Sequence, residues 1–237
     1  ENFDNSIALI LEDFDGISLK EFIERNKKEV RPRIDINLFL KIAIQISDTL
    51  AHIHKNKILH IDIKPQNILI KVDVNHELPV GNIKITDFGI SSVLTQKDHE
   101  IYNPNVIEGT LTYISPEQTG RMNRSVDYRS DLYSLGVTFY EMLTGILPFK
   151  STDPMELIHA HIALRPIPPI EVIPDIPEPI SNIVMKLLSK NAEDRYKSAY
   201  GVYNDLKKCL TQLENKGKID SFAPGENDIS DKFYIPQ

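Results

Sequence analysis

The sequence predicts a mainly α-helical domain that carries one small β hairpin. Apolar residues recur at helical spacing over residues 38–53, and over residues 132–143 they lie on nearly all sides of the expected helix. Two short isoleucine-rich runs, 68–70 and 83–85, flank a polar stretch, which is the pattern of two strands joined by a loop. We therefore expect the first helix to be amphipathic, the second to be central and buried, and the two strands to pair.

The N-terminal part contains further elements with recognisable boundaries. The apolar run Ile7–Leu11 reads as a short buried strand that an acidic turn sequence ends. A Ser-x-x-Glu capping box that begins at Ser18 predicts a helix over residues 19–26. Asp35 or Asn37 is the expected start of the long amphipathic helix, because both residue types favour the N-cap position.

The C-terminal half reads as a series of helices separated by Gly and Pro. Gly145 is placed to end the central helix, and Pro154 to begin the next one. Isoleucines alternate with prolines over residues 166–179, which favours a packed connector over an exposed proline-rich ligand. The remaining helices are expected over residues 154–164, 180–188 and 198–213. From Lys216 onward the chain is polar with Gly and Pro, so it reads as a linker.

The composition limits the class of protein. The chain has 237 residues, of which 41% are hydrophobic, and this suits one domain with a proper core. Its formal net charge of −7 argues against a nucleic-acid-binding protein, which would show a basic surface. The single cysteine, Cys209, excludes an intrachain disulfide, and no apolar run approaches the roughly 18 residues of a membrane span. We therefore expect a cytoplasmic protein without a membrane span in this segment.

Three short motifs follow one another in the first half of the chain. They are His60–Asn67, with the pattern H-x-D-x-K-x-x-N, then Asp87–Gly89 and then Ser115–Glu117. Each alone is a weak signal, because Asp, Asn, Ser and Gly are common in turns and caps. In this order and spacing they match the catalytic loop, the metal-binding turn and the substrate-loop anchor of protein kinases.

On these motifs, residues 7–213 resemble the C-terminal lobe of a eukaryotic-like serine/threonine protein kinase. The resemblance implies a protein-kinase-like fold, ATP and Mg²⁺ as cofactors, and a protein substrate. Asp62 would orient the attacking hydroxyl, and Lys64 would neutralise the transferring phosphoryl group. Asn67 and Asp87 would hold Mg²⁺, and Asp87 would also bridge the metal to the nucleotide phosphates.

The same resemblance assigns further residues to the substrate and the nucleotide. Thr110, in the segment before the third motif, would contact the catalytic loop. Leu11 would be the gatekeeper, while Glu12 and Phe14 would belong to the hinge that holds the adenine. Leu69 would form the floor of the adenine pocket. Core packing explains the apolar assignments equally well.

Three other residues match structural positions of the family. Asp131 resembles the aspartate of the central helix that braces the backbone of the catalytic loop. Glu117 and Arg195 resemble the family's buried ion pair, which is costly to break from one side, at about 3–5 kcal/mol.

The resemblance also implies a domain organisation. Residues 1–16 would be the end of the N-terminal lobe, with its last strand and the hinge; residues 17–215 would be the C-terminal lobe, and residues 216–237 a linker toward a following domain. No G-x-G-x-x-G sequence occurs, so we expect the N-terminal lobe, with its phosphate-binding loop and strand lysine, to be largely absent from this chain. Residues 117–124 resemble kinase domains at the front of large bacterial multi-domain sensor kinases, which implies neighbouring ATPase and sensor domains in the full-length chain.

Two alternative functions stay open. The chain could be a non-catalytic pseudokinase, or a small-molecule phosphotransferase of the aminoglycoside-kinase type, which shares the H-x-D-x-x-x-x-N loop. The retained acidic and metal-binding residues argue against the first, and Lys64 and Glu117 argue against the second. In one departure from the family pattern, Ile61 stands where an arginine usually receives an activation-loop phosphate, so we do not expect a phosphate-driven switch.

Overall fold

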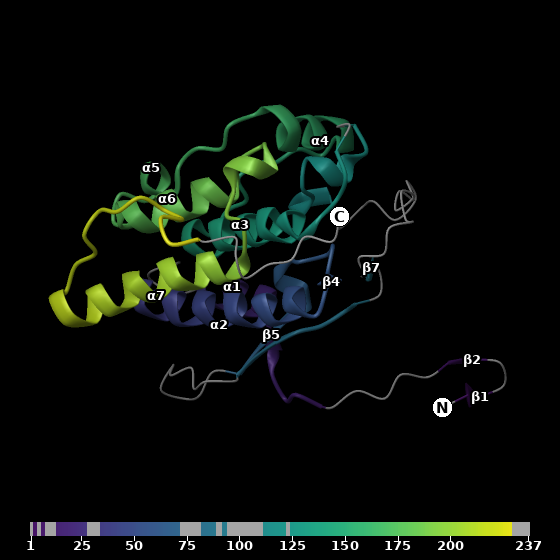
Figure 1. The fold of residues 1–237 in the computed structure, drawn as a ribbon, viewed down its shortest axis with the longest axis horizontal. Helices are drawn as coiled ribbons and strands as arrows, with labels where there is room; N and C mark the ends of the chain where they lie inside the picture. The colour runs from purple at the N-terminus through teal and green to yellow at the C-terminus, as the bar shows by residue number, and fades with distance from the viewer. Residues whose placement is uncertain are drawn as a thin grey trace.

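The structure is a computed structural model, and it describes residues 2–3, 6–7, 13–27, 34–71, 82–88, 92–93, 111–121 and 124–228 of the chain. Helices dominate these residues (Figure 1). Helix α2 (Ile36–Lys55) packs along α7 (Ala199–Lys216), and α3 (Tyr128–Thr144) runs through the middle, between this pair and α6 (Glu178–Leu187). The mainly helical fold that the sequence predicts is confirmed.

Helix α2 begins where the sequence predicts. Asp35 is its N-cap, and one carboxylate oxygen accepts hydrogen bonds from the backbone N–H groups of Asn37 and Leu38 at 2.9 and 3.3 Å. The apolar residues at helical spacing, among them Ile42 and Ile46, are fully buried. This stripe fixes the face that α2 turns toward the core.

Helix α3 is the centre of the domain, and nearly all of its residues are buried. Gly136 allows α6 to approach closely, because a Cβ at this position would lie 2.7 Å from Cβ of Leu187. The helix ends at Gly145, which adopts the left-handed conformation with φ of 71°. The predictions of a buried central helix and of its end are both confirmed.

The small sheet has the strand order β3–β5–β6, and all of its pairs are antiparallel. Strands β5 (Ile68–Ile70) and β6 (Ile83–Ile85) form the hairpin that the sequence predicts. Strand β3 (Ile17–Ser18) was not predicted, because its two residues carry no strand periodicity of their own. Two further strands, β4 (Ile58–Leu59) and β7 (Ser92–Val93), pair on either side of the catalytic motif in the sequence.

The first expected strand is described only at its beginning. Strand β2 (Ser6–Ile7) pairs antiparallel with β1 (Asn2–Phe3), and residues 8–12 lie outside the described part of the chain. Helix α1 (Leu19–Lys27) follows β3, and the N–H of Glu21 donates to the Ser18 hydroxyl at 3.1 Å. The predicted cap at Ser18 is therefore confirmed.

The connector rich in proline contains the short helix α5 (Pro169–Val172), which follows α4 (Pro154–Ala163). Ile176 is buried in the core, whereas Ile167 is 59% exposed. Pro166, Pro169 and Pro179 are buried as well, so the connector packs against the domain at several positions along its length, as the sequence predicts.

The chain after α7 folds back against the domain. Gly217 ends α7, and the N–H of Gly225 donates to the carboxylate of Asp205 at 2.6 Å. Asp228 accepts hydrogen bonds from the backbone N–H of Lys197 and, at 2.8 Å, from the hydroxyl of Ser198, which is the N-cap of α7. The sequence did not predict this packing of residues 217–228. The linker toward a following domain stays a prediction.

None of the helices in the described residues is long and apolar enough to cross a membrane. Cys209 is fully buried in α7, where burial raises the pKa of its thiol to about 12. A thiol with such a pKa is not a nucleophile at neutral pH, which agrees with an ordinary packing position.

Candidate active site

The catalytic motif forms a loop between β4 and a short 3₁₀ helix, Pro65–Asn67. The Nζ of Lys64 donates to one carboxylate oxygen of Asp62 at 2.6 Å, and the Nδ2 of Asn67 donates to the same oxygen at 2.9 Å. Nδ2 of Asn67 also donates to the backbone carbonyl of Asp62 at 2.9 Å. The structure therefore brings these three predicted residues together around one nearly buried carboxylate.

Asp131 holds the backbone of this loop, as the sequence predicts. Its two carboxylate oxygens accept hydrogen bonds from the N–H groups of His60 and Ile61, at 2.9 and 2.7 Å. The ring of His54 adds a third bond, from Nε2 at 2.9 Å. Asp131 is 1% exposed, so this carboxylate has exchanged water for three protein donors.

Ile61 adopts a strained backbone conformation next to Asp62. Its φ is 70°, in the left-handed region that a β-branched residue rarely enters. Such a conformation costs about 1–3 kcal/mol and persists only where the surroundings determine it. The N–H donates to Asp131, and the carbonyl accepts a hydrogen bond from Nε2 of Gln118 at 2.8 Å.

The second motif lies beside the catalytic loop. The N–H of Thr86 donates to the carbonyl of Asn67 at 2.8 Å, and Nε2 of His60 bonds the carbonyl of Thr86 at 2.9 Å. The ring of Phe88 packs on His60 with centroids 4.8 Å apart. Asp87, between these contacts, is exposed and has a positive φ of 65°. The backbone at Asp87 is thus fixed at the catalytic loop, while Gly89 lies outside the described residues.

The residues present fit a magnesium site of the kind that the resemblance implies. The amide nitrogen of Asn67 is committed to Asp62, so the amide oxygen is the atom that could bind a metal. Asp87 supplies a solvent-exposed carboxylate on the neighbouring turn. No cluster of three or more His, Cys, Asp or Glu side chains suited to a metal occurs in the described parts of the chain. Mg²⁺ commonly takes only one or two protein ligands and completes its shell with water and phosphate.

The predicted nucleotide-binding residues are only partly described. Leu69 lies on β5 between the buried Ile68 and Ile70, so its side chain projects from the opposite face of the sheet. The ring of Phe14 lies near this sheet, with the Nζ of Lys84 at 5.1 Å from its centroid. The other predicted contacts, Leu11, Glu12 and Thr110, lie outside the described residues.

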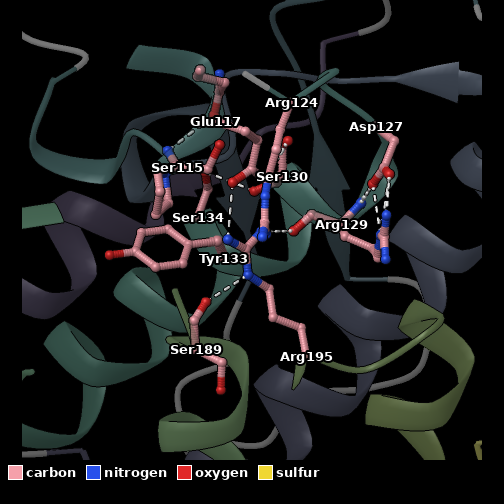
Figure 2. Close-up of polar contacts among 12 residues, drawn as sticks. Ser115, Glu117, Arg124, Asp127, Arg129, Ser130, Tyr133, Ser134, Ser189 and Arg195 are labelled. Atoms are coloured by element: carbon pink, nitrogen blue, oxygen red, sulfur yellow. Dashed lines mark hydrogen bonds and ion pairs between the residues drawn. The ribbon is translucent and has the colours of Figure 1, made fainter. Parts of the chain in front are cut away.

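Glu117 and Arg195 form the predicted ion pair that anchors the substrate loop (Figure 2). Two guanidinium nitrogens donate to the two carboxylate oxygens at 2.7 and 2.9 Å, and the hydroxyl of Ser130 adds a bond at 2.7 Å. Arg195 also donates to the carbonyls of Arg129, Ser189 and Lys190. Its side chain is fully buried, and that of Glu117 is 4% exposed.

The electrostatics of this pair follow from its geometry. Burial by itself would raise the pKa of Glu117, but the hydrogen bonds and the charge of Arg195, together with the Ser130 hydroxyl, outweigh it. The net result is a pKa of Glu117 below its ordinary value. The carboxylate is therefore ionised at neutral pH, and its attraction to Arg195 stabilises the folded state.

Comparison with known proteins agrees with this site. The model of the protein kinase domain family matches residues 2–205. The chain belongs to this family, on its eukaryotic-like serine/threonine side. A probable serine/threonine-protein kinase of Clostridium perfringens is 34% identical over 200 residues, and the serine/threonine-protein kinase PrkC of Bacillus subtilis is 34% identical over 204 residues.

These relatives are much longer than the chain. The matches cover 84% and 86% of this chain but only 27% and 29% of the two relatives. The hybrid signal transduction histidine kinase G of Dictyostelium discoideum is 36% identical over 240 residues, which is 76% of this chain and 7% of that protein. The family is thereby established for the chain, and the activity of the whole protein is a matter for proposal.

Sequence reasoning missed two residues that support the loop. Gln118 contacts the loop directly, through the carbonyl of Ile61, which lies 57 residues earlier in the sequence. His54 supports the loop indirectly, through its hydrogen bond to Asp131, which lies 77 residues later in the sequence. For Gln118, the sequence offered one indication of a role, namely its position directly after Glu117 of the third motif.

Proposed function

We propose that the chain is the catalytic lobe of a protein kinase that phosphorylates serine and threonine hydroxyls with ATP. The observation that carries this proposal is the arrangement of Lys64 and Asn67 around the carboxylate of Asp62. A pseudokinase has no need to keep these three groups together. Phosphoryl transfer does need them, because it depends on positioning and on charge neutralisation.

Each side chain has a role in this proposal. Mg²⁺-ATP supplies the transferable phosphoryl group when it is bound. The carboxylate of Asp62 orients the substrate hydroxyl and accepts its proton, while Lys64 offsets negative charge beside it. Asn67 would offer its amide oxygen to Mg²⁺, because its amide nitrogen is fixed by Asp62. Asp87 would provide a second oxygen for the metal.

We further propose which hydroxyl groups are phosphorylated and in which cellular process the reaction takes part. Lys64 in the catalytic loop favours serine and threonine over tyrosine, and two relatives bear the name serine/threonine-protein kinase. We place the reaction in bacterial signal transduction in the cytoplasm. Another relative is named a hybrid signal transduction histidine kinase and extends far beyond the match, which supports further domains in the full-length protein. We propose that these include ATPase and sensor domains.

The test uses the full-length protein, Mg²⁺ and radiolabelled ATP. Asp62→Asn and Asp87→Asn should each lower the rate of phosphoryl transfer by a factor on the order of 10²–10³ or more, since each removes one charged group from the site. The matched control is Asp48→Asn, the same change on an exposed face of α2, and it should leave the rate unchanged. Phosphoamino-acid analysis of the product should give phosphoserine or phosphothreonine.

The outcomes separate the alternatives. Wild-type protein without any transfer would point to a pseudokinase. Transfer only to small hydroxyl compounds would point to a small-molecule phosphotransferase. Near-normal transfer by Asp87→Asn would refute the proposed metal-binding role of Asp87. Phosphotyrosine as the dominant product would contradict the proposed specificity for serine and threonine.

A further inference from the structure

Gln118 connects two functional segments through its amide group. It lies in the 3₁₀ helix Glu117–Thr119 and is half-buried. Its Nε2 donates to the carbonyl of Ile61 at 2.8 Å, and its Oε1 accepts from the backbone N–H of Ser115 at 3.1 Å. A carbonyl can only accept and a backbone N–H can only donate, so the two partners fix the orientation of the amide.

The contact falls on the strained residue of the catalytic loop. Ile61 has a φ of 70° and directly precedes Asp62. Asp131 holds its N–H at 2.7 Å, and Gln118 holds its carbonyl. Side chains from two separate elements thus hold both polar groups of one residue. This is the kind of surrounding that a strained conformation requires in order to persist.

The side chain of Ile61 is apolar, so it cannot form a hydrogen bond or an ion pair that would hold the catalytic loop. It is 6% exposed and belongs to a small apolar cluster with Leu59 and Tyr128. The 3₁₀ helix that carries Gln118 is itself fixed, because the preceding Glu117 is paired with Arg195. The rigid support of the loop on this side therefore comes through the neutral amide of Gln118.

We propose that Gln118 is a positioning residue, which holds the carbonyl of Ile61 so that the carboxylate of Asp62 keeps its place in the active site. This role rests on the proposed function. It also links the substrate-loop anchor to the catalytic loop without a phosphate, so the loop is held in its working conformation in the unphosphorylated protein.

Two substitutions in the full-length protein separate the two hydrogen bonds. Gln118→Met keeps the approximate length of the side chain and removes both bonds. Gln118→Glu keeps the acceptor for Ser115 but, when ionised, loses the donor to Ile61. Both should lower kcat by a factor on the order of 10–100, because small misplacements of a reacting group have effects of this size. KM for ATP and for a protein substrate should be unchanged.

The pH profile gives a readout that a merely structural role would not move. A protonated Glu side chain can donate to the carbonyl of Ile61, whereas an ionised one cannot. The activity of Gln118→Glu relative to wild type at the same pH should therefore rise as the pH falls. The ratio for Gln118→Met should stay constant.

Hydrogen exchange tests the same role without any reaction. Peptides over residues 58–67 should exchange faster in both variants, and peptides over α7 should not. The matched control is Gln212→Leu, which removes another amide-to-backbone bond, to the N–H of Asp220 at 2.7 Å, far from the loop in the sequence. It should leave kcat and exchange over residues 58–67 unchanged.

The possible results distinguish a failure of the positioning role from a failure of the proposed function. Unchanged kcat in Gln118→Met would overturn the proposal, and so would a general loss of stability with faster exchange throughout the domain. A wild-type protein that transfers no phosphate would refute the proposed function, and the exchange data would then decide the positioning role: faster exchange confined to residues 58–67 supports it, and unchanged exchange there overturns it.

Discussion

The ion pair between Glu117 and Arg195 allows a quantitative test of what stabilises this domain. Glu117→Gln removes the negative charge and keeps the shape of the side chain. Arg195 then stays buried with a positive charge that has lost its carboxylate, although it still donates to three backbone carbonyls. The substitution therefore isolates the electrostatic part of the anchor.

The magnitude follows from the burial of the pair. Removing one partner of a buried ion pair costs about 3–5 kcal/mol, and both side chains here are at most 4% exposed. The free energy of unfolding of a whole domain is only about 5–15 kcal/mol, so the change is a large fraction of the total. In urea it should lower the midpoint of unfolding by roughly 1–3 M.

The effect should depend on pH in a defined direction. The pKa of Glu117 is lower in the folded state than its ordinary value of 4.5. Its contribution to stability is therefore fully present above that ordinary value and is lost as the pH falls through the lower, folded-state pKa. The difference in unfolding free energy between wild type and Glu117→Gln should be constant near neutral pH and should shrink in acid.

Urea titrations at several pH values, followed by circular dichroism, provide the measurement. The control is Glu193→Gln, which removes the exposed charge that pairs with Arg124 and Arg129 and should change stability by at most about 1 kcal/mol. A loss below about 1 kcal/mol for Glu117→Gln at neutral pH would refute the reasoning. A difference that stays constant in acid would show that the effect does not come from the carboxylate.

Two other sets of substitutions test the packing after α7 and the absence of a phosphate-driven switch. Asp228→Ala removes the acceptor of the Lys197 N–H and of the Ser198 hydroxyl and should lower Tm by about 2–4 °C, which calorimetry can measure, because a lost intramolecular hydrogen bond costs about 1 kcal/mol; an unchanged Tm would mean that residues 217–228 do not stabilise the lobe. Replacing Ser91, Ser92 and Thr95 together with Ala should leave kinase activity within a few-fold of wild type, since Ile61 offers no charge to a phosphate. Activity that collapses and is restored by acidic residues would contradict this expectation.

The parts of the fold that the sequence predicts are those with a local cause. Asp35 and Gly145 mark helix ends through their own backbone and side-chain chemistry, so their positions are readable from neighbouring residues. The role of Asp228 was not predictable in this way. Its partners lie about 30 positions away, and a polar stretch with Gly and Pro has the same composition whether it packs or not.

The same distinction applies to the candidate site: residues close together in the sequence were predictable, and contacts between distant residues mostly were not. Asp62, Lys64 and Asn67 lie within six residues, so one loop brings them together and one motif identifies them. The support of that loop comes from across the domain. Asp131 was identified through the family resemblance, and Gln118 was not identified, because its hydrogen bond to Ile61 becomes visible only when the substrate-loop anchor is placed in space.

This arrangement couples the stability of the domain to its chemistry. The backbone strain at Ile61, about 1–3 kcal/mol, has to be offset by contacts with rigidly held secondary-structure elements. One is α3, which presents Asp131 from the most buried helix of the described structure. The other is the 3₁₀ helix that carries both Glu117 and Gln118, so the ion pair with Arg195 fixes the amide that holds the catalytic loop. Weakening the ion pair should therefore reduce kcat as well as stability, whereas a stability change in α7 should leave kcat unaffected.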